Sequence, residues 1–408
     1  MEKHILILTT TSDFLGKFEL ENVKILQHMG YTVHYASNRN EPHYFSDEER
    51  IRNMGVHIHP IDIARSPFLL KKNYKALHQL LSVIRQFDIQ VLHCHTPVGG
   101  LLGRLAGRLC RSQNLIVIYT AHGFHFYKGA PVWNRLFYYP VEKYLARYTD
   151  ILIVINEEDF RMARKFRLKK GGRLYKIPGV GIDRTVFRPI SEKKKKLLRI
   201  QRNISPDDFF LLSIGELNEN KNHKIVLEAL VKFKNRYPDC RNIKYGICGD
   251  GFYRKQMEQW VVQMGLTDIV VLYGYCTDIP QILGCADVTV FPSKREGLGM
   301  VGLESLAMGI PVIASDNRGT REYMEHGKNG FVCRYDDIDG FVKGIEVMKN
   351  LSKEKKKKLR ICCLESVKPF DKLYAKAVMT RIYSEADHMA GQLSYEKSDK
   401  NQCYHERI

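Results

Sequence analysis

Residues 287–315 read DVTVFPSKREGLGMVGLESLAMGIPVIAS, and this stretch decides the fold. A short apolar run ends at Pro292, and a polar loop with glycines at 297 and 299 follows it. The next residues, 300–308, have helical character. Gly309 ends the helix, and Pro311 opens a second apolar run. The segment therefore predicts a strand, a ligand-accessible loop, a helix and another strand.

The same alternation extends in both directions along the chain. Short β-branched runs between amphipathic stretches predict parallel sheets that are covered by helices on both faces. The predicted strands are 4–10, 32–37, 56–61, 91–95, 115–120, 151–156, 173–178, 209–215, 242–248, 270–275, 287–292, 311–315 and 330–335. The expected class is α/β, with two doubly wound Rossmann-like domains facing each other across a cleft.

The alternation pauses at GVGIDRTVFRPISEKKKK, residues 179–196, which we interpret as the domain boundary. We expect an N-terminal domain over 1–187 and a C-terminal domain over 188–370. A helix over 371–388 is expected to cross back to the N-terminal domain. The polar residues 389–408 are expected to form a loose tail.

The composition is that of a globular cytoplasmic protein. Of 408 residues, 44% are hydrophobic and 27% charged, and no apolar run approaches the roughly 18 residues of a membrane span. The start, MEKHILILTTTSD, resembles a first strand more than a signal peptide. Ten cysteines without a C-x-x-C pair indicate neither a disulfide scaffold nor a zinc ribbon.

The net charge of +19 is the unusual bulk property. It is compatible with nucleic acid, an anionic membrane surface or anionic small substrates. The sequence has no RNP-like aromatic motif, zinc finger or basic zipper, which argues against nucleic acid.

Ligands of doubly wound sheets bind outside the carboxyl ends of the strands. There, Gly297 and Gly299 would let backbone N–H groups approach a diphosphate at a helix start. Glu304 would then hold a ribose diol, and Glu296 would accept hydrogen bonds from the hydroxyls of a second sugar. The alternative is that Glu296 complements the helix dipole and Glu304 is solvated.

Several motifs together resemble those of the retaining glycosyltransferases of family 4, which have the GT-B fold. The first is E-x7-E, followed by ESLAMGIPVIAS and GxxEYMEHGKNGF. The others resemble a bacterial branch that builds exopolysaccharide, capsule or protein-linked glycans: HCHTPVGGLLGRLAGR (93–108), YTAHGFHFYKGAP (119–131), YYPVEKYLARYTD (138–150) and GELNENKNHK (215–224). The resemblance extends over nearly the whole chain.

The resemblance implies roles for individual residues of the C-terminal half. Glu304 would bind the nucleotide ribose. Glu296 would bind the donor sugar and support the developing charge. Backbone amides near Gly297, Leu298 and Gly299 would meet the diphosphate, with Leu298 in place of the phenylalanine of relatives.

Four further positions match the family. Gly215 would allow close approach of the phosphates, and Lys221 would bind them. Tyr275 would lie near the base. His122, after a strand of the N-terminal half, would lie beside the donor sugar, although a histidine at a strand end is more often structural.

Glu216 departs from the family, which has an arginine there. A carboxylate 4 Å from a diphosphate charge costs about 4 kcal/mol at an effective dielectric near 20. We therefore expect Glu216 to turn away or to pair with a cation, with Arg295 and Arg318 as loop residues that supply positive charge.

No metal and no other cofactor is expected. His93, Cys94, His95 and His125 are potential ligands, but neighbouring strand residues face opposite ways and the spacings are poor for zinc. Helix ends and basic side chains would neutralise the leaving diphosphate instead. No residue is paired as a covalent nucleophile.

The leading hypothesis is a hexosyl- or N-acetylhexosaminyltransferase. It would move a sugar from a UDP-sugar to a saccharide linked to a lipid, undecaprenyl diphosphate, at the inner face of the cell membrane. Residues 1–190 carry about 28 Lys and Arg against 16 Asp and Glu. Within them, RSPFLLKKNYKAL (65–77) and RLAGRLCR (104–111) mix apolar and basic residues, as a membrane-binding surface does; the alternative is ordinary solvated helix faces.

Three alternatives stay open. The first is a glycosyltransferase with a soluble acceptor, and the second is a GT-B sugar-nucleotide epimerase. The third is an inactive transferase that scaffolds an active partner. The simultaneous presence of Glu296, Glu304, Lys221 and His122 argues against the inactive scaffold.

Overall fold

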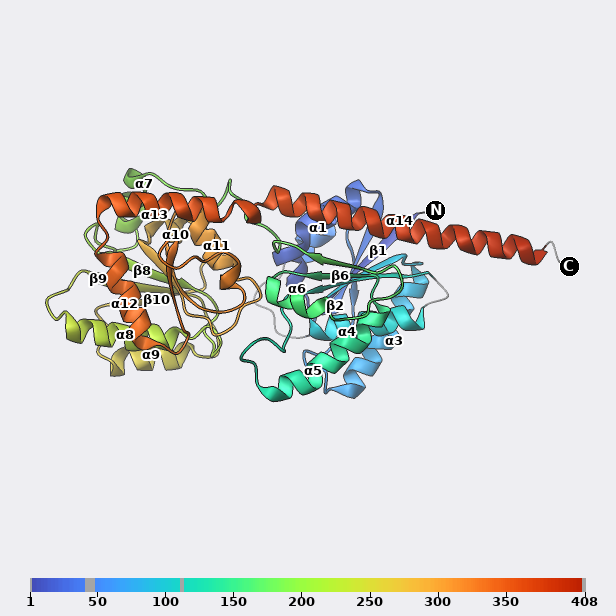
Figure 1. The fold of residues 1–408 in the computed structure, drawn as a ribbon, viewed down its shortest axis with the longest axis horizontal. Coiled ribbons are helices and arrows are strands. Elements are labelled where there is room, and N and C mark those ends of the chain that lie inside the picture. The colour runs from blue at the N-terminus through green and yellow to red at the C-terminus, as the bar shows by residue number, and fades with distance from the viewer. Residues whose placement is uncertain (1, 41–47, 111–113, 406–408) are drawn as a thin grey trace. The chain divides into compact units, whose positions relative to one another are not determined.

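The structure is a computed structural model, and it describes residues 2–40, 48–110 and 114–405, with side chains up to Gln392. The chain forms two compact units (Figure 1). Unit 1 comprises Met1–Val180 and Leu373–Ile408, and unit 2 comprises Gly181–Lys372. The sequence placed the corresponding boundaries at 187/188 and 370/371, a few residues away.

Unit 1 contains a seven-stranded parallel sheet in the order β3-β2-β1-β4-β5-β6-β7. The strands are β1 Lys3–Thr11, β2 Tyr31–Asn38, β3 His57–Pro60, β4 Val91–His95, β5 Ile116–Ala121, β6 Ile151–Val154 and β7 Arg173–Lys176. Each corresponds to a predicted strand, and the inner strands β4, β5 and β6 are buried along their whole length, as expected for a sheet covered on both faces. The order reverses between β1 and β4, so their carboxyl ends open into the region where such sheets bind ligands.

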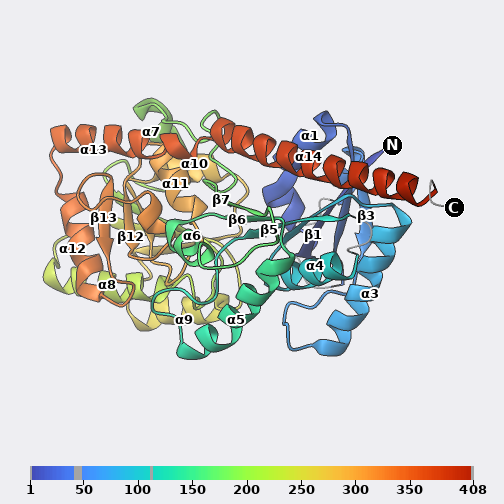
Figure 2. The same ribbon diagram turned by 45° about the vertical axis from the view of Figure 1, so that its right-hand side comes forward.

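The helices of unit 1 cover both faces of this sheet. They are α1 Leu20–His28, α2 Glu48–Asn53, α3 Leu70–Gln86, α4 Pro97–Leu109, α5 Val132–Leu145 and α6 Glu157–Ala163, with a π-helix, η1, at Leu15–Glu19 and a 3-10 turn, η3, at Ala146–Tyr148. Helix α4 packs on β1, β4 and β5 and has α3 and α5 as neighbours (Figure 2). The core of the unit lies between these helices and the sheet.

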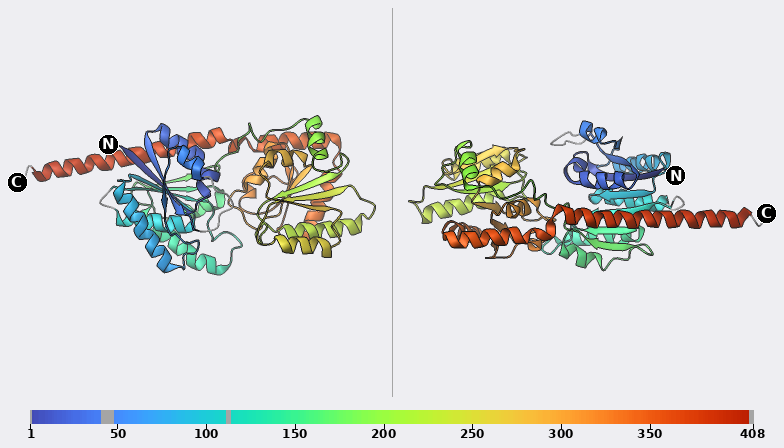
Figure 3. Two further views of the ribbon diagram at one scale, coloured as in Figure 1. Left: turned by 180° about the vertical axis from the view of Figure 1, so that it is seen from behind. Right: turned by 90° about the horizontal axis from the view of Figure 1, so that it is seen from above.

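Helix α14, Lys372–His405, runs along unit 1 (Figure 3). Tyr383 is buried, and its hydroxyl lies 2.9 Å from Nδ1 of His93. Farther along, Asp387 accepts hydrogen bonds from Tyr31 and Lys3. The backbone is helical beyond residue 389, where the sequence predicted a loose tail. Extending a formed helix fixes few additional dihedral angles per hydrogen bond, so polar residues can continue it.

Unit 2 contains a six-stranded parallel sheet in the order β10-β9-β8-β11-β12-β13. The strands are β8 Phe209–Ile214, β9 Ile243–Cys248, β10 Val270–Gly274, β11 Val288–Phe291, β12 Val312–Ser315 and β13 Gly330–Cys333. All six were predicted. The switch point lies between β8 and β11, so the loops that follow these two strands are neighbours.

Helices cover this second sheet as well. They are α7 Glu192–Ile200, α8 His223–Arg236, α9 Arg254–Gln263, α10 Ile279–Cys285, α11 Met300–Ala307, α12 Ile338–Lys349 and α13 Lys353–Ser366, with 3-10 turns η4 at Thr320–Glu322 and η5 at Lys368–Phe370. Two apolar clusters pack against the sheet and form the core. The predicted α/β class, with two doubly wound sheets, is confirmed.

Candidate active site

The loops after β8 and β11 of unit 2 are joined by hydrogen bonds. The backbone N–H of Lys294 donates to the carbonyl of Asn220 over 2.8 Å, and the Asn220 amide donates to the carbonyl of Arg295 over 3.0 Å. The Asn222 amide donates to the carbonyl of Pro292 over 3.2 Å. The two loops, about 75 residues apart in sequence, therefore form one surface at the carboxyl edge of the sheet.

Lys221 lies at the centre of this surface. Its Nζ is 2.7 Å from Oε1 of Glu296, and 5.4 Å from the centroid of the Phe291 ring. Its aliphatic chain crosses Gly215, where an added Cβ would lie 3.3 Å from Cδ and Cε of the lysine. A side chain at position 215 would therefore crowd the aliphatic part of Lys221. Sequence reasoning expected it to make room for phosphates.

The start of α11 depends on Gly299, whose φ is +87°. A Cβ there would lie 2.7 Å from the Phe291 ring and 3.0 Å from the Tyr323 hydroxyl, so only glycine fits. That hydroxyl donates to the carbonyl of Gly299 over 3.0 Å. The first N–H groups of α11 have no capping side chain. Such donors at a helix start suit an anion.

The remaining predicted residues of this segment lie just before α11 or on it. Leu298 is buried, and its carbonyl lies close to Gly319, where a Cβ would approach it to 2.8 Å. Gly297 precedes it and is partly exposed. Glu304 lies on α11 and is partly buried, and burial raises the pKa of its carboxyl from 4.5 to about 7. Near neutral pH, Glu304 is therefore partly protonated in the absence of a ligand.

Two residues of the site were missed as site residues by the sequence. Tyr323 is buried, and the charges of Glu296 and Glu304, together with burial as the main cause, raise its pKa well above the usual value. Arg318 was expected only as a loop cation. It is buried, and its Nε donates to the carbonyl of Glu296 over 3.2 Å. The motif GxxEYMEHGKNGF contains the available signal, because Tyr323 lies within it.

Two other predicted positions lie at the margin of this surface. Glu216 is exposed, and its Cγ lies beside Gly251, 3.1 Å from where a Cβ would be. Tyr275 is exposed and follows Gly274 at the end of β10. That strand is separated from β8 by β9, so Tyr275 lies two strands away from the Lys221 loop.

His122 belongs to unit 1, where it follows β5. Its Nε2 lies 3.1 Å from Nδ1 of His95 on the adjacent strand β4. Burial lowers the pKa of His122 to about 4, so the ring is neutral at pH 7. The ring of Phe14 contacts both imidazoles, at centroid distances of 5.1 Å and 5.4 Å.

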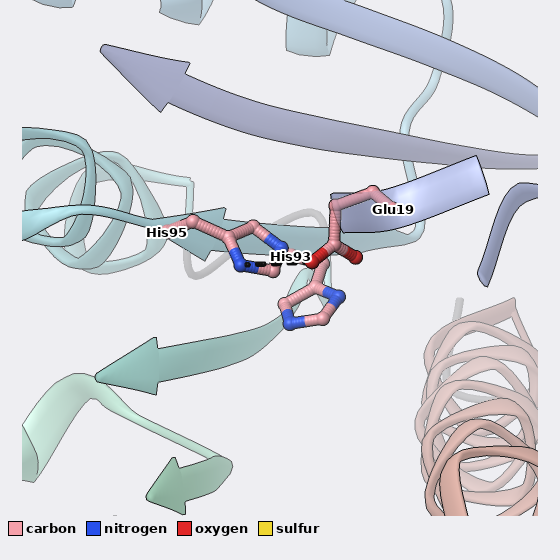
Figure 4. A group of neighbouring side chains, drawn as sticks. All are labelled: Glu19, His93 and His95. Carbon is pink, nitrogen blue, oxygen red and sulfur yellow. Dashed lines mark ion pairs between the residues drawn. The ribbon is translucent and has the colours of Figure 1, made fainter. Parts of the chain in front are cut away.

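The prediction that strand alternation keeps the potential ligands apart is wrong for His93 and His95. Alternation separates Cys94, which faces Gly103 of α4, from the histidines, but His93 and His95 are two residues apart and share a face. Glu19, at the end of the π-helix η1, joins them (Figure 4). One potential ligand atom from each residue lies within 4.8 Å of the others. His125 instead stacks on Tyr138.

The two predicted membrane-binding stretches differ in the structure. In 65–77, Phe68, Leu70 and Tyr74 are exposed beside exposed lysines. In 104–111, Arg104 is buried, pairs with Glu142 over 2.6 Å and lies over the Tyr119 ring. Arg104 is thus part of the interior, whereas Arg108 and Leu109 of this stretch are exposed; residue 111 lies outside the described residues.

Comparisons with known proteins agree with this architecture. Residues 194–361 match the family model of group 1 glycosyl transferases, and residues 4–156 match that of 4-like glycosyl transferases. A putative glycosyltransferase of Bacillus subtilis, EpsD, is 41% identical over 346 residues, which cover 85% of this chain and 87% of EpsD. An Escherichia coli UDP-Gal:alpha-D-GlcNAc-diphosphoundecaprenol alpha-1,3-galactosyltransferase is 30% identical over 68% of this chain and 70% of that protein.

Solved structures show the same fold. The Anabaena protein HepE, crystallised with UDP-glucose, superposes with a TM-score of 0.73 at 18% identity, covering 94% of this chain and 99% of that chain. The sucrose-phosphate synthase of Thermosynechococcus elongatus also gives a TM-score of 0.73 at 18% identity, over 94% and 98% of the two chains. The chain belongs to glycosyltransferase family 4, as the two family models and the sequence identity to EpsD show, and the shared architecture shows that it has the GT-B fold.

Proposed function

We propose that the chain is a retaining transferase of bacterial surface-polysaccharide synthesis, which moves a hexose or N-acetylhexosamine from a UDP-sugar to a saccharide on undecaprenyl diphosphate. The observation that carries the proposal is the Lys221–Glu296 contact of 2.7 Å beside the glycine-opened start of α11. A cation, a carboxylate and a helix start without a capping side chain thus belong to neighbouring segments of unit 2. A sugar diphosphate needs all three.

In this proposal each group of unit 2 meets one part of the donor. Lys221 and the first N–H groups of α11 bind the diphosphate. Glu296 accepts hydrogen bonds from the donor sugar, and Glu304 accepts them from the ribose diol. Tyr275 lies near the uracil. His122 of unit 1 is assigned to the donor sugar by family resemblance.

In this proposal the sugar is transferred with retention of its anomeric configuration. The acceptor hydroxyl oxygen bonds to the anomeric carbon on the face from which UDP departs. The bond from that carbon to the phosphate oxygen breaks, its electron pair stays on UDP, and the same phosphate oxygen takes the acceptor proton. Glu296 stabilises the positive charge that develops on the sugar, while Lys221 stabilises the negative charge on UDP. In this scheme the protein neutralises the diphosphate without a metal ion.

The relatives support the choice of donor and acceptor. HepE was crystallised with UDP-glucose, which favours a UDP-sugar. The E. coli relative carries undecaprenyl diphosphate in the description of its acceptor, which favours a lipid-linked saccharide. Neither relative identifies the sugar that this chain transfers.

A lipid-linked acceptor requires contact with a membrane surface. No helix among the described residues is long and apolar enough to cross a bilayer. Helix α5 instead carries a set of exposed apolar side chains, Val132, Trp133, Leu136, Phe137, Val141 and Tyr144, between exposed cations. Trp133 is 68% exposed. The exposed residues at the start of α3 lie on the same face of the sheet. Apolar side chains between cations suit an anionic bilayer at the inner face of the membrane.

The test is a panel of UDP-sugars with undecaprenyl-diphosphate saccharides as acceptors, and with the same saccharides lacking the lipid. We expect one donor to release UDP and to lengthen the lipid-linked acceptor with an α-linked sugar, read by mass spectrometry and by the anomeric proton coupling. Turnover with the lipid-free acceptor alone would establish a soluble acceptor. Interconversion of the free UDP-sugar would establish an epimerase.

A further inference from the structure

The imidazole of His122 is hydrogen-bonded to His95, and His95 lies beside a second buried polar side chain, Glu19. Nε2 of His122 lies 3.1 Å from Nδ1 of His95, and that same Nδ1 lies 3.6 Å from Oε1 of Glu19. Oε2 of Glu19 accepts a hydrogen bond from the Asn22 amide over 2.6 Å. His95 and Glu19 are both almost fully buried. These contacts therefore run from the π-helix η1, through β4, to the residue that follows β5.

The hydrogen bond to His95 uses one of the two nitrogens of His122. Within the part of the chain that the structure describes, no hydrogen bond is seen at the other nitrogen, Nδ1, and the ring is partly exposed. The ring of Phe14 packs against both imidazoles and shields the bond between them. A histidine whose one nitrogen is fixed in this way presents the other in a defined direction and protonation state.

We propose that His95, beside Glu19, is a positioning residue that holds His122 in one orientation and one tautomer, so that Nδ1 is presented to a ligand. The inference rests on the proposed function only for the identity of the ligand that Nδ1 meets. Burying a polar side chain costs free energy unless it is hydrogen-bonded. His95 and Glu19 are both buried, where an apolar residue would avoid this cost. Holding His122 accounts for both.

Hydrogen bonds explain the cluster better than a metal ion. Both nitrogens of His93 are already used, Nδ1 with the Tyr383 hydroxyl at 2.9 Å and Nε2 with the Thr120 hydroxyl at 2.8 Å. Nδ1 of His95 is used by His122. Of the ring nitrogens of His93 and His95, only Nε2 of His95 has no hydrogen-bond partner among the described residues. A metal ion held by Glu19, His93 and His95 would have to displace a hydroxyl from His93.

The test uses the full chain labelled with nitrogen-15 histidine. A two-bond proton–nitrogen correlation spectrum at pH 7.5 shows which nitrogen of each ring carries the proton, and His122→Asn assigns the signals of His122. We expect a single tautomer for His122 in the wild type. We expect His95→Phe, which keeps a ring of similar shape, to give shifts averaged between the two tautomers. The matched control is His93→Phe, on the same strand and face, which keeps the single tautomer.

Kinetics and metal analysis complete the test. With the donor found in the panel, His95→Phe is expected to lower kcat/KM about tenfold, while Glu19→Gln lowers it less. Averaged tautomers in the wild type, or a His95→Phe spectrum identical to it, would overturn the proposal. So would a stoichiometric metal in the purified wild type that is lost in His95→Phe. The spectrum needs no turnover, so a chain that transfers no sugar would refute the proposed function and leave this result standing.

Discussion

Nζ of Lys221 and Oε1 of Glu296 lie 2.7 Å apart, although the two residues belong to different loops. Both side chains are mostly shielded, at 22% and 15% exposure. Each is thus the counter-charge of the other before a donor binds. In the proposed function, a diphosphate at the start of α11 would offer Lys221 a second anion, and Glu296 would then accept hydrogen bonds from a sugar.

The pair should be energetically coupled. In a double-mutant cycle of Lys221→Ala and Glu296→Ala, we expect a coupling of about 1–2 kcal/mol in the free energy of unfolding, because a shielded pair is screened less than an exposed one. The control is Lys294→Ala with Glu219→Ala, a pair at 2.9 Å whose carboxylate is 76% exposed. It should couple by less than about 0.5 kcal/mol. Equal coupling in both cycles would show that the Lys221–Glu296 contact is an ordinary surface pair.

Glu304 should make UDP binding depend on pH. Its pKa is raised to about 7, so the ionised fraction rises between pH 6 and pH 8. The ionised form accepts stronger hydrogen bonds from a diol, so the affinity should rise with pH over this window. We expect Glu304→Ala to lose about 2–3 kcal/mol of UDP affinity at pH 8. Calorimetric titration at both pH values measures both effects.

Glu304→Gln is the control for the pH effect. UDP itself takes up a proton near pH 6, and this contribution is shared by all variants. The steeper part of the wild-type dependence should therefore be absent in Glu304→Gln. An unchanged affinity in Glu304→Ala would remove this residue from the site.

Glu19 should destabilise unit 1 as the pH rises. Burial raises its pKa from 4.5 to about 8, so the folded state binds the extra proton between these values. The free energy of unfolding then falls with increasing pH, by at most about 1.4 kcal/mol per unit. Above pH 6.5 the neutral histidines no longer oppose this trend. Glu19→Gln cannot ionise, so its stability relative to wild type should rise between pH 6.5 and pH 8, as denaturant unfolding would measure.

An exposed carboxylate gives the comparison for that experiment. Glu354 is 79% exposed, and Glu354→Gln should shift stability by the same small amount at every pH. A Glu19→Gln variant that behaves in this way would mean that Glu19 is ionised in the folded state. It would then need a cation beside it.

Helix α5 should bind anionic vesicles. Replacing Trp133 and Phe137 with serine removes two exposed aromatic side chains, and we expect flotation with anionic vesicles to fall severalfold. Phe252→Ser is the matched control, since Phe252 is 92% exposed but belongs to unit 2. Equal flotation of all three proteins would exclude α5 as the membrane contact.

The sequence predicted every strand of both sheets, because most of these parallel strands are buried and form short apolar runs between helical segments. It also located the loop 293–299 and the helix start, since glycines and carboxylates at fixed spacing have few other uses. It could not predict that Lys221 meets Glu296, because the hydrogen bonds through Asn220 and Asn222 that join their loops leave no pattern in the sequence.

Other failures have a similar cause. Arg104 seemed to belong to a basic surface, but burial depends on the face that α4 turns to the sheet and on Glu142, a residue of the next helix. Glu19 was not among the predicted site residues, and the π-helix η1 brings it to His95. In both cases a long-range partner determines the role of the residue.

The most direct test of the central claim compares the initial rates of sugar transfer for Lys221→Ala, Glu216→Ala and Lys294→Ala, across UDP-sugar concentrations. Lys294 is a neighbouring lysine that pairs with Glu219 at the surface. If Lys221 binds the diphosphate, Lys221→Ala should lower kcat/KM at least about a hundredfold, close to 3 kcal/mol, whereas Glu216→Ala and Lys294→Ala should retain nearly full activity. Wild-type rates for Lys221→Ala, or an equal loss in all three variants, would contradict the claim.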